Sequence, residues 1–191
     1  RLNGMLLIPA LVVHAWVNRK TLSRRQLKGI LGIAAAMSGG WFVYLCMNRY
    51  LYDNWTYFLA QTSKQWGINL ALPFTGVWTA IQMWGGRSAE EKITIIIMEV
   101  GFTLVALALT PLLARRSRAL EFTYVALNML LFVSMDFWLS RPRYLLTLFP
   151  LFIAVAPWIS RGPLRLALYL FGSAALFGIY WALYLNAQWA H

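Results

Sequence analysis

The sequence predicts an all-α polytopic membrane protein with about six spanning helices. Of its 191 residues, 60% are hydrophobic, so too few polar side chains remain to cover a soluble globule of this size. The apolar residues also gather in runs that approach the length of a membrane span, about 17 to 25 residues. We expect spans over residues 2–17, 29–47, 93–113, 119–139, 144–159 and 164–185.

The first apolar run is shorter than a full span, and the chain begins at Arg1 instead of Met. We therefore expect the sequence to be the C-terminal part of a longer protein, with its first span here truncated. Residues 1–191 then form a single membrane domain. Spans one and two lie within residues 1–47, an external connection covers residues 48–92, and four further spans follow in residues 93–191.

The basic residues predict which connections face the cytoplasm. The 17 lysines and arginines lie mostly at the ends of apolar runs and form no soluble basic surface, which argues against a nucleic-acid partner despite the net charge of +11. Residues 18–28 carry five of them, residues 114–118 carry three and residues 160–165 carry two. Because short connections rich in Lys and Arg face the cytoplasm, strict alternation places residues 48–92 and 141–143 on the external side.

The external connection is too long for a simple link between spans, and its aromatic residues recur at helical intervals. We expect two amphipathic helices here, over residues 50–66 and 73–86, that lie in the membrane interface as a lid or platform. Their apolar stripes are Leu51, Trp55, Phe58, Leu59 and Trp66 in the first helix, and Phe74, Val77, Trp78 and Ile81 in the second.

Two arginines, Arg141 and Arg143, flank Pro142 against the outer start of the fifth span. Ser140 can cap a helix that begins there, and a helix start carrying two guanidinium groups suits a phosphate. A lipid-linked phosphate or diphosphate at the outer leaflet would be the natural ligand. Arginines at a span end also snorkel to ordinary lipid headgroups, and the residue pattern leaves both interpretations open.

Besides Glu121, which is next to a basic connection, two acidic residues lie inside apolar runs, where a carboxylate is costly unless it is paired. We expect Asp136 to form an ion pair with Arg141 or Arg143; the alternative is that it orients one of these arginines for a ligand. Glu99 could serve as a proton or ion site, although it has no acidic or basic companion within its run.

Other kinds of chemistry find little support in the sequence. The lone Cys46 and the widely separated His14 and His191 form no cluster for a metal, so we expect neither a metal nor another cofactor. The chain also lacks a nucleophile motif and a glycine-rich phosphate loop.

Three stretches resemble the C-terminal half of the PIG-V-like mannosyltransferases, the bacterial relatives of GPI mannosyltransferase 2. These are "RLNGMLLIPALVVHAW", "YDNWTYFLAQTSKQW" and "SRPRYLLTLFPLFIAVA". The resemblance implies the GT-C glycosyltransferase fold in a bacterial plasma membrane, with transfer of a sugar from a polyprenyl-phosphate donor on the external or lumenal face. The implied partners are this lipid-linked donor, membrane lipids and a glycan or lipid acceptor.

The family pattern also implies roles for particular residues. Arg1 with Gly4, then Asp53 with Ala60, Gln61 and Trp66, and finally the Arg143–Leu146 segment match its three motifs. The implied donor-phosphate ligands are Arg143, Arg141 and Tyr144, and the implied substrate-binding residues are Arg1, Asp53, Gln61 and Trp66. The acidic residues usually held to be the catalytic base in this fold would precede Arg1, so the catalytic residue is unknown from this chain.

Two other classes of function stay open at the level of sequence. A multispanning lipid or solute transporter, or a flippase, would place polar residues in several spans, whereas Glu99 is the clear charge near a span centre. A scaffold subunit would neither bind nor consume a lipid-linked sugar.

Overall fold

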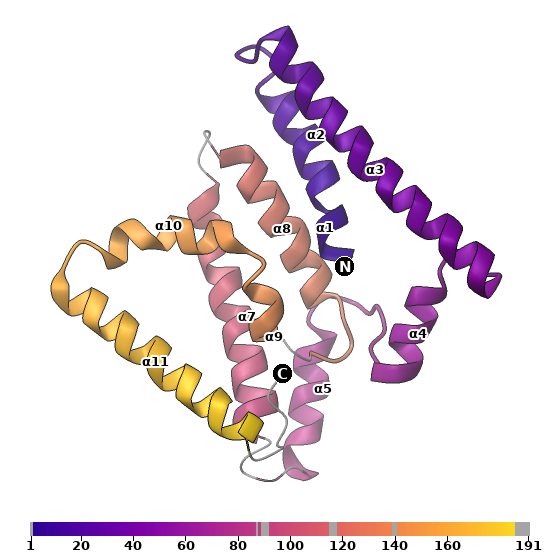
Figure 1. Ribbon diagram of the computed structural model, residues 1–191. Coiled ribbons are helices and arrows are strands. Elements are labelled where there is room, and N and C mark those ends of the chain that lie inside the picture. Colours follow the sequence, from indigo (N-terminus) through magenta and orange to yellow (C-terminus); the bar gives the residue numbers. More distant parts are fainter. Residues whose placement is uncertain (1, 87, 89–91, 115–117, 139–140, 186–191) are drawn as a thin grey trace.

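The computed structural model describes residues 2–86, 88, 92–114, 118–138 and 141–185, and these residues form helices and connections without a β-strand (Figure 1). The α-helices are α1 (Leu2–Met5), α2 (Leu7–Val17), α3 (Arg24–Tyr52), α4 (Tyr57–Trp66), α5 (Thr75–Met83), α7 (Met98–Leu109), α8 (Ala119–Val133), α9 (Arg141–Leu145), α10 (Phe149–Ile159) and α11 (Pro163–Leu185). Short helices of other types are η1 (Trp84–Gly86), η2 (Lys92–Ile97) and η3 (Thr110–Leu113). The predicted all-α class is confirmed.

Two of these helices, α3 and α11, are long and apolar enough to cross a membrane. Most of their side chains are exposed to the surroundings rather than packed inside the protein, as lipid-facing residues are. Shorter apolar helices occupy the positions of the other four predicted spans. At a rise of about 1.5 Å per residue they are shorter than the bilayer core, so two candidate spans is the number that helix length supports.

The N-terminal end of α3 is fixed by a capping box. The Ser23 hydroxyl accepts a hydrogen bond from the Gln26 amide at 3.2 Å, and the Gln26 side chain accepts one from the Ser23 amide at 2.9 Å. These two bonds satisfy N–H groups that a helix start otherwise leaves unpaired.

The other end of α3 divides the first predicted interfacial helix. Asp53 adopts the left-handed conformation with φ of 54°, which ends α3. The Asn54 side chain then accepts a hydrogen bond from the Thr56 amide at 2.9 Å, so the chain turns before α4 begins at Tyr57. The expected helix over residues 50–66 is therefore shorter, and residues 50–52 belong to α3.

The helical core lies where α7, η3, α8, α9 and α10 meet. Its most deeply buried members are Leu113, Val125, Met129, Phe132 and Leu148. On the other side of α8, α2 packs between α8 and α3 (Figure 1). The helix α8 thus connects the C-terminal bundle to the α2–α3 hairpin.

The expected span over residues 119–139 is wrong at its C-terminal end, because α8 stops at Val133. The carbonyl groups at the helix end are taken by a distant part of the chain: Phe74 N–H donates to the Val133 oxygen at 2.8 Å, and Ala71 N–H donates to the Ser134 oxygen at 2.9 Å. An isolated antiparallel bridge between Leu70 and Met135 continues this pairing. The pairing replaces the last turns of the predicted helix.

The expected span over residues 144–159 is likewise not one helix. The chain leaves α9 after Leu145 and enters α10 at Phe149, with Pro150 in the first turn of α10. Proline lacks an N–H, and its ring would clash with the carbonyl four residues earlier in a continuous helix. In Figure 1, α10 consequently runs at a steep angle across α7 instead of along it.

Candidate functional site

A cavity of about 770 Å³ lies between α2, α3, α4 and the end of α8. This volume is in the range of small-molecule binding sites, about 300 to 1,000 Å³. Its walls are largely apolar, with Ile8 from α2, Trp41 from α3 and Leu131 from α8 among the lining residues. Polar groups enter on one side, where Ser63 of α4 and Asn69 of the following loop line the space.

This apolar cavity is where the three sequence stretches of the family resemblance meet. Gly4 contributes from the first stretch, Leu59 from the second and Tyr144 from the third. The first stretch packs through α2 against α3 and α8, the helices that precede the other two stretches in the chain. Periodicity within each stretch could not predict this, because the meeting depends on packing between helices that are distant in sequence.

Tyr144 joins the proposed phosphate-binding segment to the cavity. Its ring lines the cavity and packs against Phe132, with ring centroids 6.0 Å apart. The guanidinium carbon of Arg143 lies 5.6 Å from the centroid of the Tyr144 ring, while the Arg143 side chain is exposed. The guanidinium group of Arg143 thus lies beside the cavity wall, and the side chain remains exposed.

The helix that carries these residues offers less to an anion than the sequence indicated. Because α9 has five residues, only a short stack of peptide dipoles stands behind its N-terminal end. Any anion would therefore depend mainly on the arginine side chains. The backbone of Arg141 begins α9, whereas the Arg141 side chain and all of Ser140 lie outside the described residues.

Asp136 bonds to an amide, and no ion pair with Arg143 is present among the described residues; the expected alternative partner, the Arg141 side chain, lies outside them. Its Oδ1 accepts a hydrogen bond from the Asn69 backbone N–H at 2.8 Å, and its Oδ2 accepts one from the Asn69 side-chain nitrogen at 3.0 Å. The Asp136 amide in turn donates to the Asn69 carbonyl at 3.1 Å. Ser63 Oγ lies 2.6 Å from Asn69 Oδ1 and extends the network to α4. This network holds the loop that closes one side of the apolar cavity.

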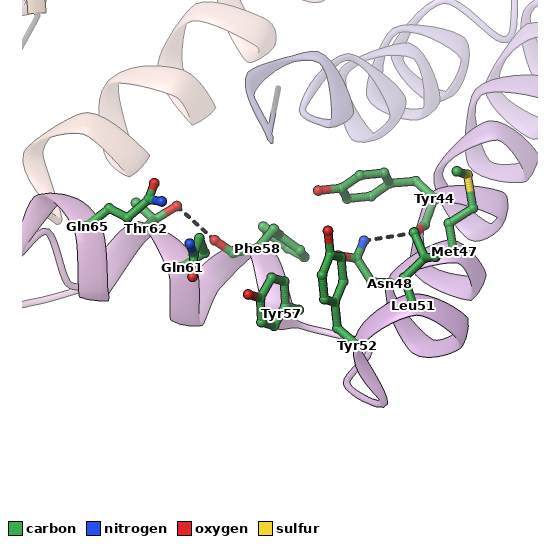
Figure 2. A pocket seen from close by; sticks show the side chains of 10 residues that line it. All are labelled: Tyr44, Met47, Asn48, Leu51, Tyr52, Tyr57, Phe58, Gln61, Thr62 and Gln65. Carbon is green, nitrogen blue, oxygen red and sulfur yellow. Dashed lines mark hydrogen bonds between the residues drawn. The ribbon is translucent and has the colours of Figure 1, made fainter.

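A second hollow, of about 390 Å³, lies between the C-terminal end of α3 and α4 (Figure 2). We call it the amide–tyrosine cleft, after the side chains of Tyr44, Asn48, Tyr52, Tyr57, Gln61 and Gln65 that line it. Gln61, a predicted substrate-binding residue, therefore lies in this cleft. Sequence reasoning missed Tyr44 and Asn48, although with Trp41 they follow a helical spacing that marks one face of α3.

The other predicted substrate-binding residues are not gathered here. Asp53 is exposed at the end of α3, where it forms an ion pair with Arg49, and it lines neither hollow. Arg49 Nη1 also donates to the Asp53 carbonyl at 2.6 Å. Arg1 and the side chain of Trp66 lie outside the described residues.

Glu99 is buried in α7, directly after the π-helical turn η2, with 4% of its surface exposed. It borders an enclosed space of about 10 Å³, which has room for about one water molecule and no larger ligand. Trp138 closes this space and packs so tightly on Gly76 of α5 that a β-carbon there would overlap the indole ring. Within the described part of the chain, no group of three His, Cys, Asp or Glu side chains could hold a metal.

Comparisons with protein-family models, with curated proteins and with solved structures find no match to this chain.

Proposed function

We propose that this chain is the C-terminal part of a membrane glycosyltransferase of the PIG-V-like, GT-C class. In this proposal it moves a sugar, mannose by the resemblance, from a polyprenyl-phosphate donor to an acceptor on the external or lumenal face of a membrane. The observation that carries the proposal is that Gly4, Leu59 and Tyr144, one from each resembling stretch, line a single apolar cavity. Residues that serve one reaction must converge in this way, whatever their separation in sequence.

The proposed topology has six spans, with residues 48–92 outside. Its support is that the α2–α3 turn and the start of α8 lie toward one end of the molecule, whereas α4 and α5 lie toward the other (Figure 1). The basic connection 18–28 lies at the first of these ends, which the positive-inside bias assigns to the cytoplasm.

The chemistry of the cavity suits a lipid phosphate. A prenyl chain gains about 0.8 kcal/mol for each CH₂ group that it buries in apolar surroundings, and the apolar cavity provides such walls. The phosphate would then lie near the Tyr144 edge, within reach of Arg143 and Arg141. As the sugar departs, negative charge develops on the phosphate. Guanidinium groups stabilise this charge, and Tyr144 can donate a further hydrogen bond.

The test is the release of polyprenyl phosphate from polyprenyl-phosphate mannose by the full-length protein in membranes. Arg143→Ala should lower the rate about a hundredfold, because one donor to the developing charge is lost, and Arg143→Lys should recover part of it. Arg19→Ala is the matched control: Arg19 makes the same kind of contact, 4.2 Å over the ring of Trp16, away from the cavity. Unchanged release in Arg143→Ala with the fold retained would refute the phosphate role.

A transporter or flippase is the second candidate, and the position of Glu99 is what favours it. A buried carboxylate that follows a π-helical turn is a common feature of functional membrane helices. In reconstituted vesicles, Glu99→Gln would then abolish pH-driven lipid or solute movement. If vesicles containing the wild-type protein move neither a lipid nor a solute above the protein-free rate, this candidate fails.

A further inference from the structure

The amide–tyrosine cleft has a chemical character that the proposed function has not used. Its lining includes three amide side chains, Asn48, Gln61 and Gln65, and three phenol rings, Tyr44, Tyr52 and Tyr57. All ten residues drawn around it in Figure 2 are uncharged. The lining offers no counter-ion to a charged ligand, so it favours a neutral ligand.

The polar groups of the cleft match a ligand rich in hydroxyl groups. An amide side chain both donates and accepts hydrogen bonds, as a hydroxyl group does. Asn48 is 5% exposed, and its Nδ2 donates to the Tyr44 carbonyl at 2.9 Å, so this amide group is held in place where it lines the cleft. Gln61 and Gln65 line the cleft from α4, one helical turn apart, and Figure 2 draws Tyr57 and Tyr52 between Gln61 and Asn48.

The tyrosines add flat surfaces to this polar lining. Tyr52 and Tyr57 stack with centroids 3.9 Å apart and an interplanar angle of 8°, which joins the end of α3 to the start of α4. About half of the Tyr52 side chain stays exposed. The negative face of an aromatic ring attracts polarised C–H groups, and the C–H face of a pyranose ring presents such groups in a plane.

An aromatic wall separates the cleft from the apolar cavity. Tyr44 and Phe58 line both hollows, and their ring centroids lie 5.8 Å apart. Trp41 packs on the cavity side, 5.2 Å from Tyr44 and 5.5 Å from Phe58. Two adjacent spaces thus differ in chemistry: the cavity is mainly apolar, and the cleft has a larger share of amide and hydroxyl groups.

We propose that the amide–tyrosine cleft is a binding site for a neutral carbohydrate, with Gln61, Gln65 and Asn48 bonding its hydroxyl groups and Tyr52 packing against its ring. Carbohydrate binding follows from the cleft itself. The further assignment of this sugar as the glycosyl acceptor rests on the proposed function, because the cleft adjoins the space assigned to the lipid donor.

The experiment uses the protein in nanodiscs of zwitterionic phosphatidylcholine, since alkyl glucoside and maltoside detergents would themselves compete as glycosides. Methyl α-D-mannopyranoside and methyl α-D-glucopyranoside are titrated, with glucuronate and glucosamine as charged comparisons, and binding is followed by saturation-transfer NMR. We expect saturable binding of at least one neutral glycoside and at least about fivefold weaker binding of both charged sugars. Equal binding of neutral and charged sugars, or binding of none, would overturn the proposal.

Two pairs of variants locate the binding. Gln61→Ala and Tyr52→Leu should each weaken it about fivefold, by loss of one hydrogen bond or one ring face. Their matched controls are Gln82→Ala on α5 and Tyr50→Leu on α3, two exposed residues that line neither hollow; Tyr50 is 88% exposed. Circular dichroism verifies the helical fold of each variant. Equal losses in the cleft variants and the controls would overturn the site.

A parallel titration with farnesyl phosphate separates this inference from the proposed function. The cleft variants should keep farnesyl phosphate binding, and Arg143→Ala should keep glycoside binding. Farnesyl phosphate binding without any glycoside binding overturns the carbohydrate site alone. Glycoside binding without farnesyl phosphate binding overturns the lipid-phosphate role alone and leaves the cleft as a carbohydrate site.

Discussion

The apolar cavity and the amide–tyrosine cleft share an aromatic wall but differ in what surrounds it. The cavity draws its lining from α1, α2, α3, α4, the loop of residues 68–70, the end of α8 and α9. The cleft is built from α3 and α4 alone, which are neighbours in sequence. The cavity is thus a product of long-range packing, whereas the cleft is nearly a local structure. Changes that loosen the helix bundle should therefore harm the cavity first.

Filling the apolar cavity with a larger side chain should produce the largest difference in ligand binding between the two hollows. Gly40 lines the cavity, and a β-carbon there would meet no atom within 4 Å. Gly40→Trp should therefore fold, occupy the cavity and exclude about one isoprene unit, which weakens farnesyl phosphate binding about a hundredfold. Glycoside binding in the cleft should not change.

The neighbouring Gly39→Trp is the control for this variant, since Gly39 has the same open surroundings but does not line the cavity. Equal effects of the two substitutions on farnesyl phosphate binding would show that the cavity does not hold the prenyl chain.

A second variant compares the two hollows through its effect on the free energy of unfolding and on the binding of each ligand. Asp136→Ala removes two hydrogen bonds from Asn69 and should lower the free energy of unfolding by about 2 kcal/mol. Because this network holds the cavity loop and not the cleft, farnesyl phosphate binding should weaken while glycoside binding persists. Thermal unfolding in nanodiscs measures the first effect and titration measures the second. A variant as stable as the wild type would show that the Asp136–Asn69 bonds contribute little.

The smallest expected effect is a weaker binding of the ligands in both hollows. Phe58→Leu keeps an apolar side chain but removes the ring contacts with Trp41 and Tyr44, which are worth about 1 kcal/mol. Both ligands should then bind about fivefold more weakly. Weaker binding of only one ligand would show that the aromatic wall contributes to binding in that hollow alone.

The sequence located the helices well because a long apolar run is a local property. The apolar runs coincide with α1–α2, α3, η2–α7–η3, α8, α9–α10 and α11, although several ends differ and residues 144–159 are divided between α9 and α10. Pro150 was visible in the sequence, yet the break before α10 also needed α9 to pack beside α7. Six crossings and glycosyl transfer stay predictions.

The candidate site could be anticipated only in pieces. The family resemblance implied Gln61, and the charges beside α9 indicated Arg143. The partner of Asp136 could not be predicted, since Asn69 and Asp136 meet only after α8 ends and the loop pairs with it. The apolar cavity depends on the same long-range packing. The hydrophobic periodicity of the sequence cannot predict such packing.

Photo-crosslinking with a diazirine-bearing farnesyl phosphate tests the central claim most directly. If the apolar cavity holds the prenyl chain, the adducts should map to Ile8, Trp41 and Leu131, which lie on three different helices around it, and unlabelled farnesyl phosphate should suppress them. Adducts concentrated instead on exposed α11 residues such as Phe171 and Phe177, and unaffected by the unlabelled ligand, would contradict the account.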